Sequence, residues 1–183
     1  EFRHVLFRSV FGSNPQGRHG AGAAKAAMAF GCRYGEAKGF SPNKQTYAII
    51  TKNLTAGITV DGITYEKEGY LSISKEQIES QIDEMYELAR TKYQDKNFLI
   101  TYQYETWPNG SQKKSLNGYT SQEMLEMFFR KDIPSNIIFH DSYKPHVEKL
   151  LENTNNKQEE NKEMQDRKST RLNSSHGYIS YAV

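Results

Sequence analysis

GSNPQGRHGAGAA, residues 12–24, is the stretch of sequence that decides the fold. Val10 and Phe11 precede it and are typical of the end of a strand. The alanine-rich segment 21–30 that overlaps its end favours a helix, because alanine has the highest helix propensity of the amino acids. The sequence therefore predicts a strand, a loop over residues 12–20 that contains several glycines, and a helix whose start is directed at that loop.

Strands and helices are expected to alternate along the chain beyond this stretch. Short apolar runs predict buried strands at 46–51, 97–102 and 136–140. Two capping boxes, in which the first residue is Ser74 in one case and Thr120 in the other, predict helices that begin directly after them. A long polar loop, 103–119, is expected between the second of these strands and the second of these helices.

The segment ITVDGITY, residues 58–65, predicts a β-hairpin, because Asp61-Gly62 between two β-branched runs favours a tight turn with positive φ. We expect it as an insertion, with a continuation at 70–73 left open. Toward the C-terminus a short helix is expected at about 145–151, followed by disorder in the polar residues up to 165.

This order of elements predicts an α/β fold. We expect a single three-layer domain with a mainly parallel or mixed sheet, helices on both faces, and the hairpin insertion. Ligands of such sheets bind at the carboxyl ends of the strands. The predicted carboxyl ends carry two loops with glycine, Gly12–Gly22 and Asn117–Gly118.

Both ends of the chain resemble translated sequencing adapter. DRKSTRLNSSH, at 166–176, is one reading frame of a common adapter, and EFRHVLFRS, at 1–9, differs from a frame of its reverse complement only by His4 in place of Arg. We expect segments 1–9 and 166–183 to be non-native and the chain to come from assembled environmental reads. The expected organisation is then an α/β domain at 10–144 and a polar tail at 145–165.

Composition limits the classes of partner. The whole chain has 24 basic and 22 acidic residues, and 19 and 20 remain when the two adapter-like ends are left out. We therefore expect no nucleic acid partner, since nucleic acid binding calls for a basic face. No apolar run approaches the length that crosses a bilayer, so no membrane association is expected. A single cysteine, Cys32, fits a reducing compartment and predicts a cytoplasmic location.

The loop over residues 12–22 favours an anionic ligand. Glycines let the backbone approach a ligand closely, and a helix start offers unpaired N–H groups. The spacing matches neither a Walker loop, which needs Gly-Lys-Ser/Thr, nor the dinucleotide fingerprint GxGxxG. The alternative interpretation is a tight turn packed on the sheet. His19 is the weak candidate for acid–base catalysis, because histidine side chains titrate near neutral pH.

Three further features could serve a function, but we favour a structural role for each of them. His140 and Asp141 could form a dyad but are expected to make a strand-end hydrogen bond. Cys32 is expected to be a packed thiol rather than a nucleophile, and Trp107 with its neighbouring tyrosines to form a lid or part of the core rather than a stacking edge. No metal site and no cofactor are expected, because the histidines are separated and the carboxylates are not clustered.

The stretch FGSNPQGRHGAGAAKAA, residues 11–27, resembles an uncharacterised family found in phages and bacteria, which is marked by FGSN followed by G-x-HGAGAA. The similarity runs from Val10 to about Lys144. Members of that family often carry Gly-x-Ala-Gly-Tyr after the strand that matches 97–102. Here a longer loop that ends in Leu116-Asn117-Gly118-Tyr119 takes that place.

More distantly, the layout is similar to that of macro domains, which bind ADP-ribose and related nucleotides. The resemblance implies that Asn14 contacts the distal ribose and that backbone N–H groups of residues 20–22 bind the diphosphate. It also implies a second clamp at 117–119, in which Tyr119 stacks or packs.

Three functions stay open at this point: a binding module for a nucleotide or ADP-ribose-like molecule, an ADP-ribosyl or nucleotide hydrolase at the same site, and a phage or bacterial accessory protein that binds another protein. We expect the first. The residues predicted to bind the ligand are Gly12, Ser13, Asn14, Gly17, His19, Gly20, Ala21, Gly22, Asn117, Gly118 and Tyr119.

Overall fold

The computed structural model describes residues 7–130 and 132–174. Residues 1–6 and 175–183, which belong to the adapter-like ends, lie outside the described residues. The elements follow one another as β1 (Phe7–Ser13), α1 (Gly22–Met28), β2 (Gly39–Phe40), β3 (Thr46–Ile50), β4 (Ile58–Val60), β5 (Ile63–Tyr65), α2 (Lys75–Thr91), β6 (Asn97–Ile100), α3 (Ser121–Phe128), β7 (Ile137–Ile138), the 3-10 turn η1 (Asp141–Tyr143) and α4 (Lys144–Ser174).

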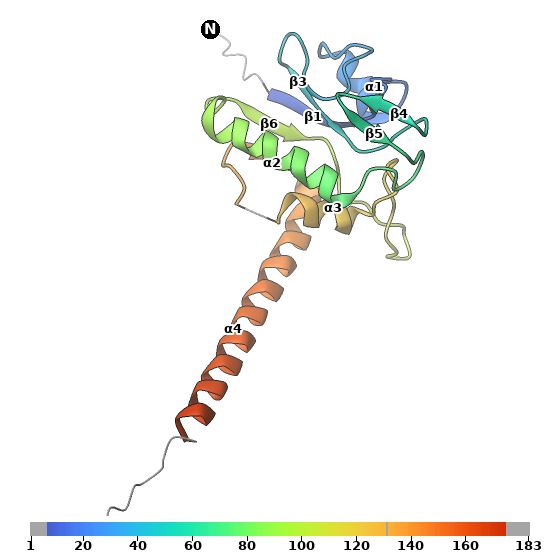
Figure 1. Ribbon diagram of the computed structural model, residues 1–183. Helices are drawn as coiled ribbons and strands as arrows, with labels where there is room; N and C mark the ends of the chain where they lie inside the picture. Colours follow the sequence, from blue (N-terminus) through green and yellow to red (C-terminus); the bar gives the residue numbers. More distant parts are fainter. Residues whose placement is uncertain (1–6, 131, 175–183) are drawn as a thin grey trace, which may run out of the picture. The chain divides into compact units, whose positions relative to one another are not determined.

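Strand β1 lies at the centre of a five-stranded sheet with the order β2-β3-β1-β6-β7 (Figure 1). It pairs in parallel with β3 on one edge and with β6 on the other, and β6 pairs in parallel with β7. Only β2 runs antiparallel, against β3. The chain thus goes from β1 to one neighbour and later crosses to the other, which makes the carboxyl end of β1 a topological switch point.

The two faces of the sheet are covered by different helices. Val10 belongs to the larger hydrophobic core together with residues of α2 and α3, whereas the next residue, Phe11, packs with Ala24 and Ala27 of α1. Successive side chains of a strand point to opposite faces, so α1 covers one face and α2 with α3 the other. The predicted α/β class, with a mixed and mostly parallel sheet, is confirmed.

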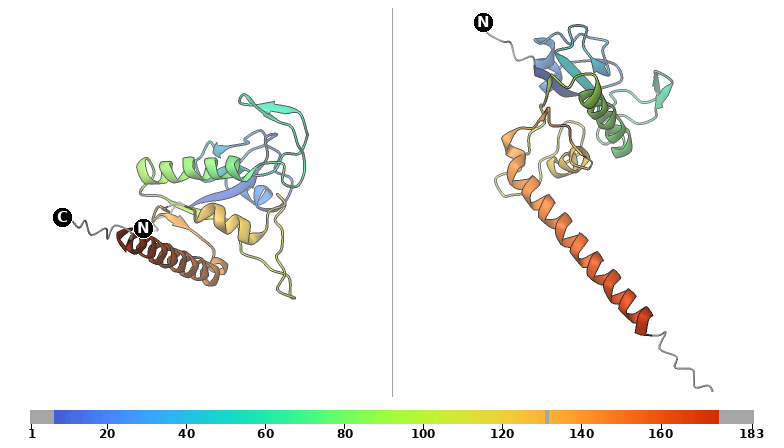
Figure 2. Two further views of the ribbon diagram at one scale, coloured as in Figure 1. Left: turned by 60° about the horizontal axis from the view of Figure 1, so that its bottom comes forward. Right: turned by 90° about the vertical axis from the view of Figure 1, so that its left-hand side faces the viewer.

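The two helices predicted from capping boxes and the predicted β-hairpin are present in the structure. Ser74 and Thr120 each accept a hydrogen bond from the backbone three residues on, in complete capping boxes. Strands β4 and β5 form a separate two-stranded sheet, joined by Asp61 and Gly62 at φ 51° and 77°. The hairpin projects from the five-stranded sheet, as both views of Figure 2 show.

The structure differs from the sequence-based description at three places. Strand β2 was not predicted, because two residues are too few for a periodic pattern. The continuation of the hairpin at 70–73, which the sequence left open, is no strand, since Leu71 has a φ of 58° that extended backbone does not allow. The polar residues after Leu151 are helical as part of α4, where disorder was expected. They include many Glu, Lys and Gln, which have high helix propensity.

The chain divides into two units, residues 1–143 and 144–183, and α4 lies in the second. Among the described residues, no helix combines the length and the apolar character that crossing a bilayer requires.

Arg8 lies in β1, inside the segment 1–9 that we expect to be non-native, and we expect it to lower the stability of the fold. Its side chain is only 6% exposed, and its guanidinium carbon lies 4.9 Å from the ring centre of Tyr93 and 5.7 Å from that of Phe40. Nε and Nη1 have no hydrogen-bond partner among the described residues. Loss of hydration lowers the pKa of this guanidinium, with Tyr93 and Asp95 opposing the effect. The aromatic contacts therefore only partly replace the lost hydration.

Replacing Arg8 with methionine is expected to raise the free energy of unfolding by about 1–3 kcal/mol, because an apolar chain of similar length removes the unpartnered buried charge. Chemical denaturation measures the change, and Arg33→Met on an exposed loop is the matched control. A lower stability for Arg8→Met would show that the aromatic contacts outweigh the cost of burying the charge.

Candidate functional site

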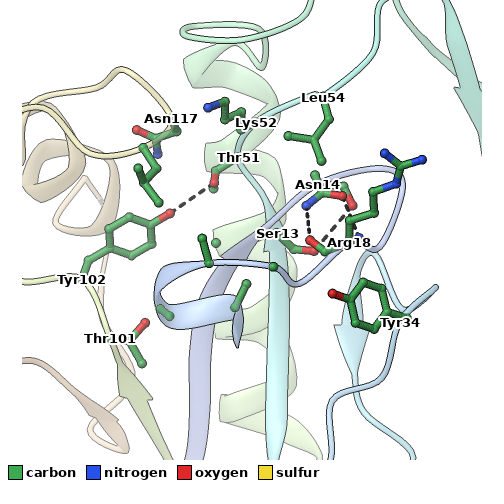
Figure 3. A pocket seen from close by; sticks show the side chains of 16 residues that line it. Ser13, Asn14, Arg18, Tyr34, Thr51, Lys52, Leu54, Thr101, Tyr102 and Asn117 are labelled. Atoms are coloured by element: carbon green, nitrogen blue, oxygen red, sulfur yellow. Dashed lines mark hydrogen bonds between the residues drawn. The ribbon is translucent and has the colours of Figure 1, made fainter. Parts of the chain in front are cut away.

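A pocket of about 550 Å³ opens at the carboxyl ends of β1, β3 and β6, at the switch point of the sheet (Figure 3). Its wall combines the ends of these strands with the start of α1 and with four loops. The lining residues are Gly12, Ser13, Asn14, Arg18, Gly20, Ala21, Ala23, Ala24, Tyr34, Thr51, Lys52, Leu54, Thr101, Tyr102, Leu116 and Asn117.

Asn14 fixes the loop that follows β1. Its side-chain oxygen accepts a hydrogen bond of 2.9 Å from the backbone N–H of Arg18, and its side-chain nitrogen donates to the carbonyl of Arg18 at 2.6 Å. The backbone carbonyl of Asn14 also accepts from the N–H of Gly17. One buried amide therefore closes the turn and positions Arg18 at the pocket.

A second buried amide, Asn53, positions the segment after β3. Its side-chain nitrogen donates to three backbone carbonyls, of Thr55, Tyr65 and Lys67, and its side-chain oxygen accepts a bond of 2.7 Å from Gln16. This network joins the loop after β1 to the base of the hairpin. Lys52 and Leu54, on either side of Asn53, are thereby held at the pocket.

His19 lies beneath this surface rather than in the pocket. Its side chain is fully buried, its ring meets the edge of Phe11 with centroids 5.6 Å apart, and Nε2 lies 3.1 Å from the carbonyl oxygen of Glu36. Because a carbonyl only accepts, Nε2 carries the proton. Nδ1 has no partner among the described residues. The imidazole packs between Phe11 and Tyr34 and supports the loop.

The opposite side of the pocket carries neutral polar groups. The hydroxyl of Tyr102, just after β6, lies 3.2 Å from that of Thr51, just after β3. Burial raises the pKa of Tyr102, while the side chains of Thr51 and Asn117 lower it by hydrogen bonding. Tyr102 therefore stays protonated at neutral pH and can donate a hydrogen bond.

The charged groups of the wall all have one sign. Arg18 and Lys52 are cations, and none of the described residues that line the pocket is an aspartate or glutamate. The ammonium of Lys52 lies 4.9 Å from the ring centre of Tyr70. Within the part of the chain that the structure describes, neither cation forms an ion pair with a carboxylate. Both charges are available to an anionic ligand.

The structure brings part of the predicted ligand-binding set to the pocket: Gly12, Ser13, Asn14, Gly20, Ala21 and Asn117 line it. Gly17, His19, Gly22, Gly118 and Tyr119 do not.

Packing explains why the other predicted ligand-binding residues do not line the pocket. A Cβ on Gly17 would lie 2.5 Å from the backbone of Gly35, and one on Gly118 would lie 2.8 Å from Tyr70. The hydroxyl of Tyr119 donates to the carbonyl of Ile73 at 2.7 Å. Gly22 begins α1 with a φ of 58°, a conformation that other residues rarely adopt. Helix α1 has only seven residues and no side-chain cap, so it is shorter than the helix expected at 21–30.

The sequence analysis did not predict the pocket residues that follow the two neighbours of β1, the strands β3 and β6. Thr51 and Lys52 directly follow β3, and Thr101 and Tyr102 directly follow β6. The rule that ligands bind at the carboxyl ends of parallel strands would have singled them out from the predicted strand ends. Arg18, Tyr34, Leu54 and Leu116 carry no comparable signal, because loop geometry alone brings them to the site.

The other sequence candidates have structural roles. Nδ1 of His140 accepts a hydrogen bond from the backbone of Ser142, as expected for a strand end. Cys32 is buried, and burial raises the pKa of its thiol. Trp107 is half exposed and contacts Lys113. Within 7–130 and 132–174, no three His, Cys, Asp or Glu side chains gather in a group that could hold a metal ion.

Comparison of the chain with models of protein families, with curated proteins and with solved structures gives no match.

Two glycines of the pocket are expected to respond differently to substitution. In Gly12→Ala the new Cβ would lie 2.1 Å from the Tyr102 hydroxyl and 2.7 Å from that of Thr51, whereas a Cβ on Gly20 meets nothing within 4 Å. We expect Gly12→Ala to lower the free energy of unfolding by about 1–3 kcal/mol, as overpacking does. Gly20→Ala is expected to leave it within about 0.5 kcal/mol. Equal losses in thermal denaturation would contradict the close approach at Gly12.

Proposed function

We propose that this protein binds a phosphate-bearing small molecule, a nucleotide or an ADP-ribose-like compound, in the pocket at the ends of β1, β3 and β6. One observation carries the proposal: among the described residues, the wall holds two cations, Arg18 and Lys52, and no carboxylate. An arginine can bind a phosphate through two parallel hydrogen bonds, and a lysine adds a point charge. The position at the switch point is where open α/β sheets bind ligands.

The rest of the wall suits a ligand with a large, less polar part. Leu116 is 63% exposed and Tyr34 61%, and both line the pocket together with Leu54. They come from different loops and meet at one site. Exposed apolar groups around a concave surface are typical of a binding site, and 550 Å³ lies in the range of small-molecule pockets. Inorganic phosphate alone would leave most of this surface uncovered.

The resemblances noted in the sequence support the same proposal. The phage and bacterial family and the more distant macro-like layout both point to the loop over 12–22, and Gly12, Asn14 and Gly20 of this loop line the pocket. A macro-like fold and a cytoplasmic location are parts of the proposal and are not shown by the structure.

A binding module fits the wall better than a hydrolase does. None of the described lining residues is a histidine, aspartate or glutamate, the side chains that most often act as general base. His19, the candidate from the sequence, is buried beneath the pocket. We therefore propose binding without turnover.

Removing either cation is expected to weaken binding about tenfold, because a hydrogen bond to a charged group stabilises a complex by about 1.5–3 kcal/mol. The variants are Arg18→Gln and Lys52→Gln. Lys25→Gln is the matched control, since Lys25 is exposed on α1 and does not line the pocket. The measurement is a thermal shift of the full chain with ADP-ribose, NAD, cyclic dinucleotides and pyrophosphate.

At 100 times its dissociation constant, a ligand adds about 2.7 kcal/mol of stability, which such a shift readily detects. No shift of the folded wild-type protein with any of these probes would contradict the proposal and leave a protein-binding role. Equal shifts for the two variants and the control would show that the ligand binds elsewhere.

Filling the pocket from Gly20 is expected to weaken binding without affecting the fold. Gly20 lines the pocket, its φ is not positive, and its Cβ direction is open, so Gly20→Val adds bulk where a ligand would lie. We expect at least a tenfold loss of affinity for the probe that binds the wild type, with a melting temperature within about 3 °C. Ala26→Val, on the exposed part of α1, is the control. Unchanged affinity in Gly20→Val would place the ligand outside this pocket.

A further inference from the structure

The pocket offers two kinds of polar group. Arg18 lies on one side, whereas the neutral polar groups of Thr51, Tyr102 and Asn117 lie on the other, with the cation of Lys52 beside Asn117 (Figure 3). The three neutral residues come from the end of β3, the end of β6 and the loop before α3. The two cations match a charged phosphate. The neutral polar groups match a different part of the ligand.

The neutral polar groups are arranged around the Tyr102 hydroxyl. Any side chain at position 12 would collide with that hydroxyl and with Thr51, since a Cβ would lie 2.1 and 2.7 Å from their oxygens. The central strand of the sheet therefore has no side chain at the point where the two hydroxyls meet. Asn117 is buried and is anchored by accepting a hydrogen bond of 3.0 Å from the N–H of Tyr119.

Of the two hydroxyl hydrogens of Thr51 and Tyr102, one has no acceptor within the pair. The two hydroxyls share one hydrogen bond of 3.2 Å, in which either oxygen can donate. Each hydroxyl has one hydrogen, so one of the two is left over whichever way the pair is oriented. The side chain of Asn117 also hydrogen-bonds to Tyr102 and lowers its pKa, as a donor to the phenol oxygen does, so this bond uses no hydroxyl hydrogen. Among the described residues, no further acceptor takes a hydrogen from Thr51 or Tyr102. Both residues line the pocket, so this donor is available to a ligand.

We propose that Thr51 and Tyr102 form a subsite for a sugar hydroxyl of the ligand, which makes the ligand a ribose-bearing phosphate compound. The inference rests on the proposed function, since it names the part of the ligand that lies beside the phosphate. A sugar hydroxyl both accepts and donates, and this side of the pocket offers a free hydroxyl hydrogen together with oxygen lone pairs. A site built for a hydroxyl discriminates strongly against a ligand that lacks it, because its own polar groups are then left unpaired.

The test compares a ribose-bearing probe with a bare one. Dissociation constants of ADP-ribose and of pyrophosphate are measured calorimetrically on the full chain for the wild type, Tyr102→Phe and Thr51→Val. Tyr104→Phe is the matched control, because it removes a phenol hydroxyl two residues away that bonds to Gln122 and does not line the pocket. Thr51→Ser keeps the hydroxyl and serves as the conservative variant.

We expect Tyr102→Phe and Thr51→Val to weaken ADP-ribose about tenfold and to leave pyrophosphate within twofold, with Tyr104→Phe and Thr51→Ser close to the wild type. Equal affinity of wild type and Tyr102→Phe for ADP-ribose would overturn the sugar subsite while the proposed function stands. Equal losses for both probes would also overturn it, since the hydroxyls would then serve the phosphate. Failure of the wild type to bind these two probes, NAD or a cyclic dinucleotide would overturn both proposals.

Discussion

The parallel pairing of β1 with β3 on one edge and β6 on the other is the constraint on which the rest of the structure depends. This pairing brings the carboxyl ends of the three strands together. There the backbone N–H of Thr51 donates to the carbonyl of Ser13, and that of Thr101 donates to the carbonyl of Val10. Helices cover both faces of the sheet, and the pocket opens at the carboxyl ends of its strands. The pocket is thus a consequence of strand order, and its chemistry is decided by the residues that follow each strand.

Two buried asparagines and one glycine determine the shape of the pocket wall. Asn14 closes the loop after β1 and Asn53 joins the segment after β3 to the hairpin, each through hydrogen bonds to backbone groups. Buried amides that are fully hydrogen-bonded make a loop rigid, so the cations of Arg18 and Lys52 are presented from ordered segments. Gly12 leaves the space in which Tyr102 and Thr51 meet. The wall is therefore largely formed before any ligand binds.

Local signals in the sequence were sufficient for most of the fold. The apolar runs at 46–51 and 97–102, the capping boxes at Ser74 and Thr120 and the Asp61-Gly62 turn each depend on neighbours within a few residues. Each forms the expected element, and the two strands end one and two residues earlier than predicted. Strand β2 and the pocket residues Tyr34, Leu54 and Leu116 depend on contacts between distant segments, which no short pattern encodes. His19 shows the same limit, because the titration of histidine near neutral pH suggested a role at the ligand, while burial against Phe11 makes it part of the packing.

The most direct test of the account maps where a ligand binds. Backbone amide chemical shifts of the isotopically labelled protein, followed by NMR during a titration with ADP-ribose, report every affected segment at once. The account predicts the largest changes in residues 12–24, 51–54, 101–102 and 116–117, which form the pocket at the ends of β1, β3 and β6. Changes centred on the second hollow, between the hairpin and α2 around Tyr65 and Gln81, or no changes in a folded protein, would contradict it.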